Sequence, residues 1–107
     1  MAREKVLIAD QDLDHLTKIY LALVHRNFKA EACNNPDEIR DRLKRFKPSV
    51  IILTSKEYQD LRDKLKIPAI VLVEKCETTS AELNYGDILL NKPVQADALI
   101  KVVDSLI

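Results

Sequence analysis

The chain has 107 residues, of which 47% are hydrophobic, and this length and composition predict one globular domain over residues 1–107. Seventeen Lys and Arg residues balance seventeen Asp and Glu residues, which removes the overall positive field with which most nucleic-acid-binding proteins attract phosphate. The single glycine, Gly86, excludes the glycine-rich loops of dinucleotide-binding motifs and P-loops.

The sequence has no visible signal peptide or membrane span. Its longest continuously apolar run, Ala69–Val73, is far too short to cross a bilayer. Cys33 and Cys76 lack the C-x-x-C spacing of redox and metal motifs, and we expect both to be reduced and mostly buried. We therefore expect a cytoplasmic protein.

Five short runs predict β-strands. Three of them are continuously apolar and rich in β-branched residues, which is typical of parallel strands that are covered on both faces. The second run is more polar and suits the edge of a sheet. The runs are Val6–Ala9, Lys29–Cys33, Val50–Leu53, Ala69–Val73 and Asp87–Leu90.

Apolar residues at helical spacing predict helices within residues 13–23, 39–46, 58–65 and 96–106, whereas residues 81–84 form at most a turn or two. Asn35 and Pro36 are an N-cap and a first-turn residue, and Pro48 and Pro68 should stop the second and third helices just before the next strands. This alternation predicts an α/β fold with a doubly wound five-stranded parallel sheet. In such folds the ligand site lies at the carboxyl ends of the strands.

The residues at these strand ends carry a family resemblance. Asp10, Gln11 and Asp12 follow the first strand, Thr54 the third and Val73 the fourth, and Lys92-Pro93 follows the fifth. Over essentially the whole chain this layout resembles the receiver domain of two-component response regulators, on the motifs VLIADQD (6–12), KPSVIILT (47–54), IPAIVLV (67–73) and ILLNKP (88–93). The resemblance implies a flavodoxin-like fold with strand order 2-1-3-4-5 and helices on both faces, and a role in phosphorelay signal transduction.

The same resemblance identifies departures from the family. Receivers have a second acid beside Asp10, where this chain has Gln11, and a phospho-accepting Asp where it has Thr54. Val73 stands in place of a Ser or Thr, so only Asp10 and Lys92 match the functional positions. The sequence therefore predicts a degenerate phosphorylation pocket, made of Asp10, Gln11, Thr54, Val73 and Lys92, in a pseudo-receiver.

The chemistry of this pocket is poor for phosphotransfer. Receivers hold Mg²⁺ with three carboxylates, and the loss of two should abolish useful affinity. A Thr hydroxyl is a weak nucleophile without an adjacent base, and we expect no histidine at a strand end facing Thr54. We expect Lys92 to pair with Asp10. The prediction is therefore a protein that is not an enzyme, with no catalytic residue and no cofactor.

A metal site in the first loop is a weaker interpretation. Asp10, Asp12, Asp14 and His15 fall within six residues, but Asp12 or Asp14 is expected at a helix start as a cap. Carboxylates in one short loop seldom converge without a ligand from another strand. We therefore predict no metal, with Asp10 and Asp12 as the weak candidates.

The leading hypothesis is an atypical receiver that acts as a phosphorylation-independent protein–protein interaction module. It would bind a protein partner, or a second copy, through residues 81–84, the strand at 87–90 and the helix at 96–106, with Leu89 and Leu90 as interface candidates. The alternative is a receiver in a phosphorelay that is still phosphorylated at Asp10 or Asp12. A flavin enzyme is disfavoured because Asp-Gln-Asp replaces the small residues that would hold a flavin phosphate.

Membranes and nucleic acids are not expected partners. Asp37, Glu38 and Asp41 temper the basic residues of segment 40–47, which should form a solvated helix face.

Overall fold

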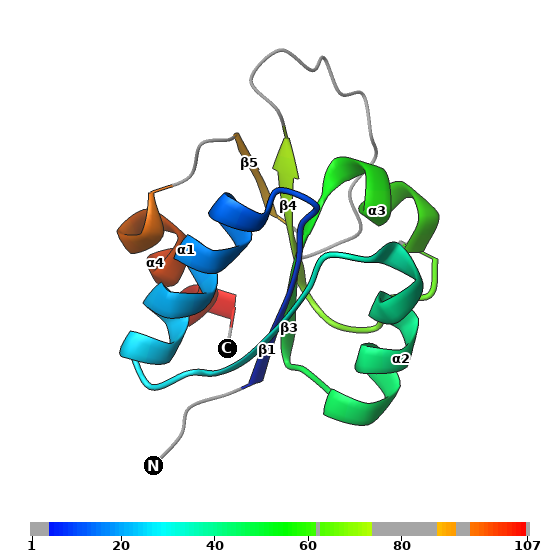
Figure 1. Ribbon diagram of the computed structural model, residues 1–107, viewed down its shortest axis with the longest axis horizontal. Helices are drawn as coiled ribbons and strands as arrows, with labels where there is room; N and C mark the ends of the chain where they lie inside the picture. The colour runs from blue at the N-terminus through cyan, green and yellow to red at the C-terminus, as the bar shows by residue number, and fades with distance from the viewer. Residues whose placement is uncertain (1–4, 62, 74–87, 92–94, 107) are drawn as a thin grey trace.

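The alternating strands and helices build one central sheet (Figure 1). The structure, a computed structural model, describes residues 5–61, 63–73, 88–91 and 95–106. Cys76, Lys92 and the predicted turn at 81–84 lie outside these ranges. The elements in chain order are β1 (Lys5–Ala9), α1 (Leu13–His25), β2 (Lys29–Cys33), α2 (Pro36–Phe46), β3 (Val50–Thr54), α3 (Ser55–Leu61), β4 (Ala69–Val73), β5 (Ile88–Asn91) and α4 (Ala96–Leu106).

The sheet has five parallel strands in the order β2-β1-β3-β4-β5. This order confirms the predicted flavodoxin-like topology, and β2 lies at an edge, as its polar composition predicted. The register pairs Ala9 of β1 with Leu53 of β3 and Val73 of β4 with Asn91 of β5. The carboxyl ends of these strands therefore meet at one edge of the sheet.

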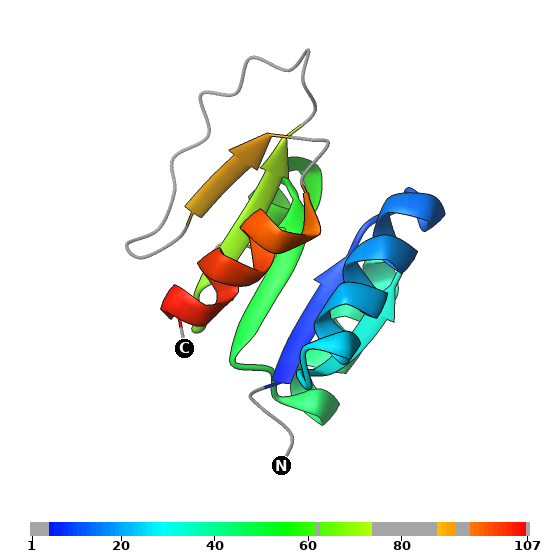
Figure 2. The ribbon, with the colours of Figure 1, turned by 90° about the vertical axis from the view of Figure 1, so that its left-hand side faces the viewer.

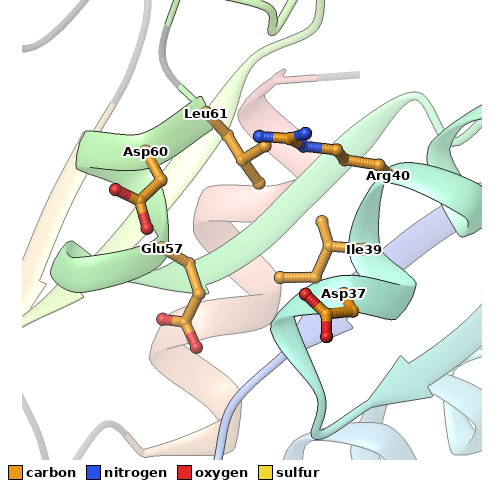
Figure 3. A pocket seen from close by; sticks show the side chains of 6 residues that line it. All are labelled: Asp37, Ile39, Arg40, Glu57, Asp60 and Leu61. Carbon is orange, nitrogen blue, oxygen red and sulfur yellow. The ribbon is translucent and has the colours of Figure 1, made fainter.

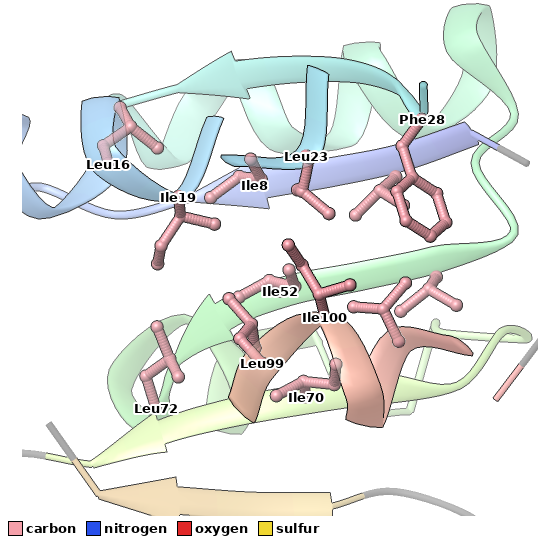
Figure 4. Packing of buried hydrophobic residues seen from close by; sticks show 13 residues of the cluster. Ile8, Leu16, Ile19, Leu23, Phe28, Ile52, Ile70, Leu72, Leu99 and Ile100 are labelled. Atoms are coloured by element: carbon pink, nitrogen blue, oxygen red, sulfur yellow. The ribbon is translucent and has the colours of Figure 1, made fainter. Parts of the chain in front are cut away.

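Alternate residues of each strand fill two separate cores. Ile8, Ile52 and Ile70 project to the face covered by α1 and α4 (Figures 2 and 4). Leu7 and Ile51 project to the other face, against α2 and α3. All five of these side chains are 0% exposed, and full burial of such a residue stabilises the fold by about 1.5–3 kcal/mol.

Local signals in the sequence fix the ends of α1 and α2. The Asp12 carboxylate accepts hydrogen bonds from the backbone N–H groups of Asp14 and His15 at the start of α1. Asn35 caps α2 in the same way, as predicted. After α1, Asn27 adopts φ 70°, and the Phe28 N–H donates to the Leu23 carbonyl at 3.0 Å, which closes the helix as Asn commonly does.

The third helix differs from the prediction. It begins directly after β3 and ends at Leu61, well before Pro68. The N–H groups of Lys64 and Leu65 both donate to the Leu61 carbonyl, at 2.8 and 3.1 Å, and this tight turn ends the helix. Leu65 and Ile67 still pack, partly buried, against the core beneath α2 and α3. The predicted helix at 58–65 is therefore confirmed as far as Leu61 and wrong at Leu65, which is partly buried outside a helix.

The helices are short. Within the described ranges no helix has both the length and the apolar character needed to span a membrane.

Candidate functional site

The candidate site lies at the carboxyl ends of β1, β3 and β4. Ala9 pairs with Leu53, so the next residues, Asp10 and Thr54, leave neighbouring strands side by side. Asp10 is only 2% exposed, whereas Thr54 is half-buried. Val73 ends β4 at the same edge and is buried, and Gln11 is exposed. The structure thus brings Asp10, Thr54 and Val73 to one edge of the sheet, while Lys92 lies outside the described residues.

Both carboxylate oxygens of Asp10 are engaged within its own loop. Oδ1 accepts the backbone N–H of Asp12 at 3.0 Å, and Oδ2 lies 2.8 Å from Nδ1 of His15. Because an ionised carboxylate only accepts hydrogen bonds, this contact requires a proton on Nδ1. The predicted pairing of Asp10 with Lys92 falls on a residue outside the described part of the chain. A backbone amide and an imidazole are therefore among the partners of Asp10.

The sequence analysis named His15 only among the possible metal ligands of the first loop and did not predict its contact with Asp10. The side chain of His15 is only 12% exposed, and its Nε2 is buried without a hydrogen-bond partner among the described residues. No histidine was expected at a strand end facing Thr54, yet His15 reaches Asp10, which leaves the strand next to that of Thr54. The available signal was helical geometry: Asp12 caps α1, so His15 lies in the first turn, directly above the end of β1.

The loop does not fit a divalent cation. Asp12 uses one carboxylate oxygen to cap α1, and Asp10 is held by His15 and by the Asp12 amide. Asp12 keeps one further carboxylate oxygen, whereas Gln11 and Thr54 offer an amide and a hydroxyl oxygen, which are weaker ligands than carboxylates. No three His, Cys, Asp or Glu side chains gather closely enough to hold a metal anywhere in the described ranges. The Mg²⁺ that the receiver resemblance implies therefore does not fit the residues described here.

The position after the buried part of β3 carries a hydroxyl side chain, that of Thr54. Thr54 is the last residue of β3, and the buried Ser55 begins α3 immediately after it. A hydroxyl at this position needs a general base to become a nucleophile at neutral pH. Nδ1 of His15 lies 2.8 Å from the Asp10 carboxylate, and this contact engages that nitrogen.

A second hollow of about 250 Å³ lies between α2 and α3 (Figure 3). Asp37 and Arg40 line it from α2, and Glu57 and Asp60 line it from α3. Glu57 is 5% exposed, and the sequence analysis did not single it out because it stands beside the apolar Tyr58 without a motif. The acids do not converge on a metal position.

Cys33 closes β2 beneath α2. Burial raises the pKa of its thiol to about 11, although the Arg42 charge works in the opposite direction. The thiol is therefore protonated and unreactive near neutral pH. This agrees with the predicted reduced, buried state of Cys33, while Cys76 lies outside the described residues.

Several surface charges of α2 form ion pairs. Arg42 forms ion pairs with Glu31 and, at 3.9 Å, with Glu38, and Arg45 lies 3.3 Å from Asp41. Two of the five basic residues of segment 40–47, Arg42 and Arg45, are thus paired with acids of α2 and β2. At the other edge of the sheet, Leu89 is 40% exposed and Leu90 is half-buried against the core under α1 and α4.

Comparison with solved structures identifies the fold. No known protein-family profile and no curated protein matches the sequence. The structure superposes on a two-component response regulator from Clostridium difficile with a TM-score of 0.82 at 21% identity, covering 97% of this chain and 95% of that chain. A Francisella response regulator receiver domain gives 0.82 at 22% identity, with 97% and 96% covered. A response regulator from Desulfuromonas acetoxidans gives 0.79 at 22% identity, with 96% and 95% covered.

These similarities cover nearly the full length of both chains, but the sequence identities are low. They show a shared architecture and do not extend to the residues of the pocket. The chain has the fold of response regulator receiver domains.

Proposed function

We propose that this chain is a receiver-like signalling domain that works without phosphorylation, in the cytoplasm, as a protein–protein interaction module. It is not an enzyme in this account. It binds a protein partner or a second copy through the face that contains β5 and α4, where Leu89 is exposed. The receiver fold supports the signalling role, and the altered strand-end residues support the independence from phosphate.

One observation carries the proposal: His15 and the Asp12 amide hold the carboxylate of Asp10. Phosphotransfer to a receiver requires a carboxylate nucleophile together with a divalent cation that neutralises the charge developing on the phosphoryl group. Here Thr54 stands in place of the nucleophilic aspartate. The carboxylate of Asp10, which a cation would need as a ligand, already contacts the Asp12 amide and His15. The pocket thus lacks both components.

The same bonds weigh against phosphorylation at Asp10 or Asp12. A phosphoryl group on Asp10 would have to enter a 2% exposed position and displace His15. A phosphoryl group on Asp12 would disturb the hydrogen bonds that its carboxylate accepts from two N–H groups at the start of α1. Either reaction would break contacts that stabilise the first helix.

Incubation with acetyl phosphate and Mg²⁺, and separately with several autophosphorylated histidine kinases, tests the proposal. We expect no acid-labile phosphate by intact-mass analysis, because no described carboxylate is presented as a nucleophile. A response regulator that accepts phosphate serves as the positive control. Labelling that disappears in Asp10→Asn or Asp12→Asn would support the phosphorelay alternative and overturn the proposal.

A further inference from the structure

The most exposed apolar surface in the described ranges lies on α1, away from the β5 edge. Of the four exposed large hydrophobic residues there, three belong to α1: Leu13 and Leu21 at 58% and Val24 at 44%. Together with Thr17 they recur at steps of four and three residues, so they form one stripe along the helix. Exposed apolar side chains that form a continuous stripe indicate an interaction surface.

This stripe borders the free edge of the sheet. Thr17 and Tyr20 of α1 line a hollow of about 320 Å³ together with Ala30 and Ala32 of β2. The opposite flank of α1 faces α4, where Arg26 lies 3.4 Å from Asp97. β2 pairs only with β1 and is the outermost strand on this side (Figure 2). The stripe and the outer row of β2 backbone groups therefore form one surface, which we name the α1–β2 edge.

We infer that the α1–β2 edge binds a second copy of this chain, with the two β2 strands pairing antiparallel across a two-fold axis. This inference rests on the proposed interaction role and names the partner for a surface separate from the β5–α4 face. Pairing of the edges would continue the sheet and satisfy the outer backbone groups of both strands.

The charges of β2 select the register. When Ala30 lies opposite its own copy, Lys29 of each chain lies opposite Glu31 of the other, which gives two cross-strand pairs of opposite sign. Arg42 already pairs with Glu31 on this side of β2, so the incoming lysine would share the Glu31 carboxylate with Arg42. A register centred on Glu31 would instead place two carboxylates directly opposite each other, which is destabilising. The edge is therefore self-complementary in one register.

The helices complete the argument. A two-fold axis perpendicular to the sheet keeps both α1 helices on the same face, and each packs over β1 and β2 beside the shared edge (Figure 2). Their apolar stripes then face each other across the junction. The small side chains of Ala30 and Ala32 leave the space between the helices open to Tyr20 and Val24. Two chains thus bury together the apolar residues that each exposes alone.

Sedimentation analysis of the full chain over a wide range of concentration tests the inference. We expect a reversible dimer. Lys29→Glu should weaken it roughly tenfold, because two attractive pairs become repulsive, and Leu21→Asp should abolish it. The double variant Lys29→Glu/Glu31→Lys should restore the dimer, since it rebuilds both pairs with the charges exchanged. Circular dichroism checks that each variant is folded.

Lys56→Glu is the matched control for Lys29→Glu, because Lys56 is an exposed lysine on α3, on the face of the sheet opposite α1 (Figure 1). It should leave the dimer unchanged. A chain that is monomeric at all concentrations, or a dimer that Leu21→Asp leaves intact, would overturn the inference. Neither result bears on phosphorylation, so failure here is distinct from failure of the proposed function.

Discussion

The position of Asp10 at a strand end could be predicted from the sequence, but its hydrogen-bond partner could not. Its placement after β1 was predictable, because a continuously apolar run ends there. Its partner was not, because the contact with His15 depends on how the first turn of α1 lies above the strand. The five-residue spacing between Asp10 and His15 matches no motif. Until α1 packs on the sheet, water competes with His15 for the hydrogen bond to Asp10.

Replacement of His15 tests the energetic weight of this contact. His15→Ala removes a hydrogen bond to a buried carboxylate, and we expect the free energy of unfolding to fall by about 1–3 kcal/mol. Urea denaturation of both proteins measures this difference. His25→Ala is the control, since His25 is exposed at the end of the same helix and should change stability by less than about 0.5 kcal/mol. Equal effects of the two substitutions would contradict the structural role of His15.

Cys33 makes a second prediction, in alkaline solution. Burial raises the pKa of the folded thiol from 9.0 to about 11, so above pH 9 the unfolded chain loses the thiol proton before the folded chain does. Stability is therefore fully present below pH 9 and falls as the pH rises toward 11, by roughly 2 kcal/mol from this group. Urea denaturation of the wild type and Cys33→Ala at pH 8 and pH 10.5 measures the difference. A pH dependence that is the same in both proteins would exclude this contribution.

For the individual helices, local sequence signals predicted the first residues better than the last residues. Asn35 with Pro36 indicated the start of α2, and an N-cap at residue 12 or 14 was expected for α1. The end of α3 was not predictable from its apolar residues, because Leu65 and Ile67 pack on the core from a turn and a loop. Apolar spacing reports which side chains are buried, and a short helix and an irregular segment can bury the same residues.

The capping role of Asp12 is testable by substitution. Asp12→Ala leaves two N–H groups of α1 without their side-chain acceptor, and we expect a loss of about 1 kcal/mol in the free energy of unfolding. Asp14→Ala is the matched control in the same first turn, and its loss should be a few tenths of a kcal/mol from the helix dipole alone. Thermal denaturation followed by circular dichroism compares them. A larger effect at Asp14 would mean that the cap is assigned to the wrong residue.

At the scale of the whole molecule, the fold was predictable because many independent signals agree. Buried strands such as Val50–Thr54 and Ala69–Val73 alternate with amphipathic helices, and only a few sheet topologies satisfy short, right-handed connections. The pocket depends instead on a handful of polar residues. The sequence has Thr54 where receivers have the acceptor aspartate. It did not predict that His15 contacts the Asp10 carboxylate.

The account depends on a receiver fold whose strand-end pocket no longer responds to a phosphoryl group. Backbone NMR of the chain during titration with Mg²⁺ and beryllium fluoride tests this most directly, because beryllium fluoride mimics the phosphorylated carboxylate of a competent receiver. We predict that the amide signals of Asp10, Thr54 and Val73 stay in place throughout the titration. Saturable shifts of these signals would contradict the account.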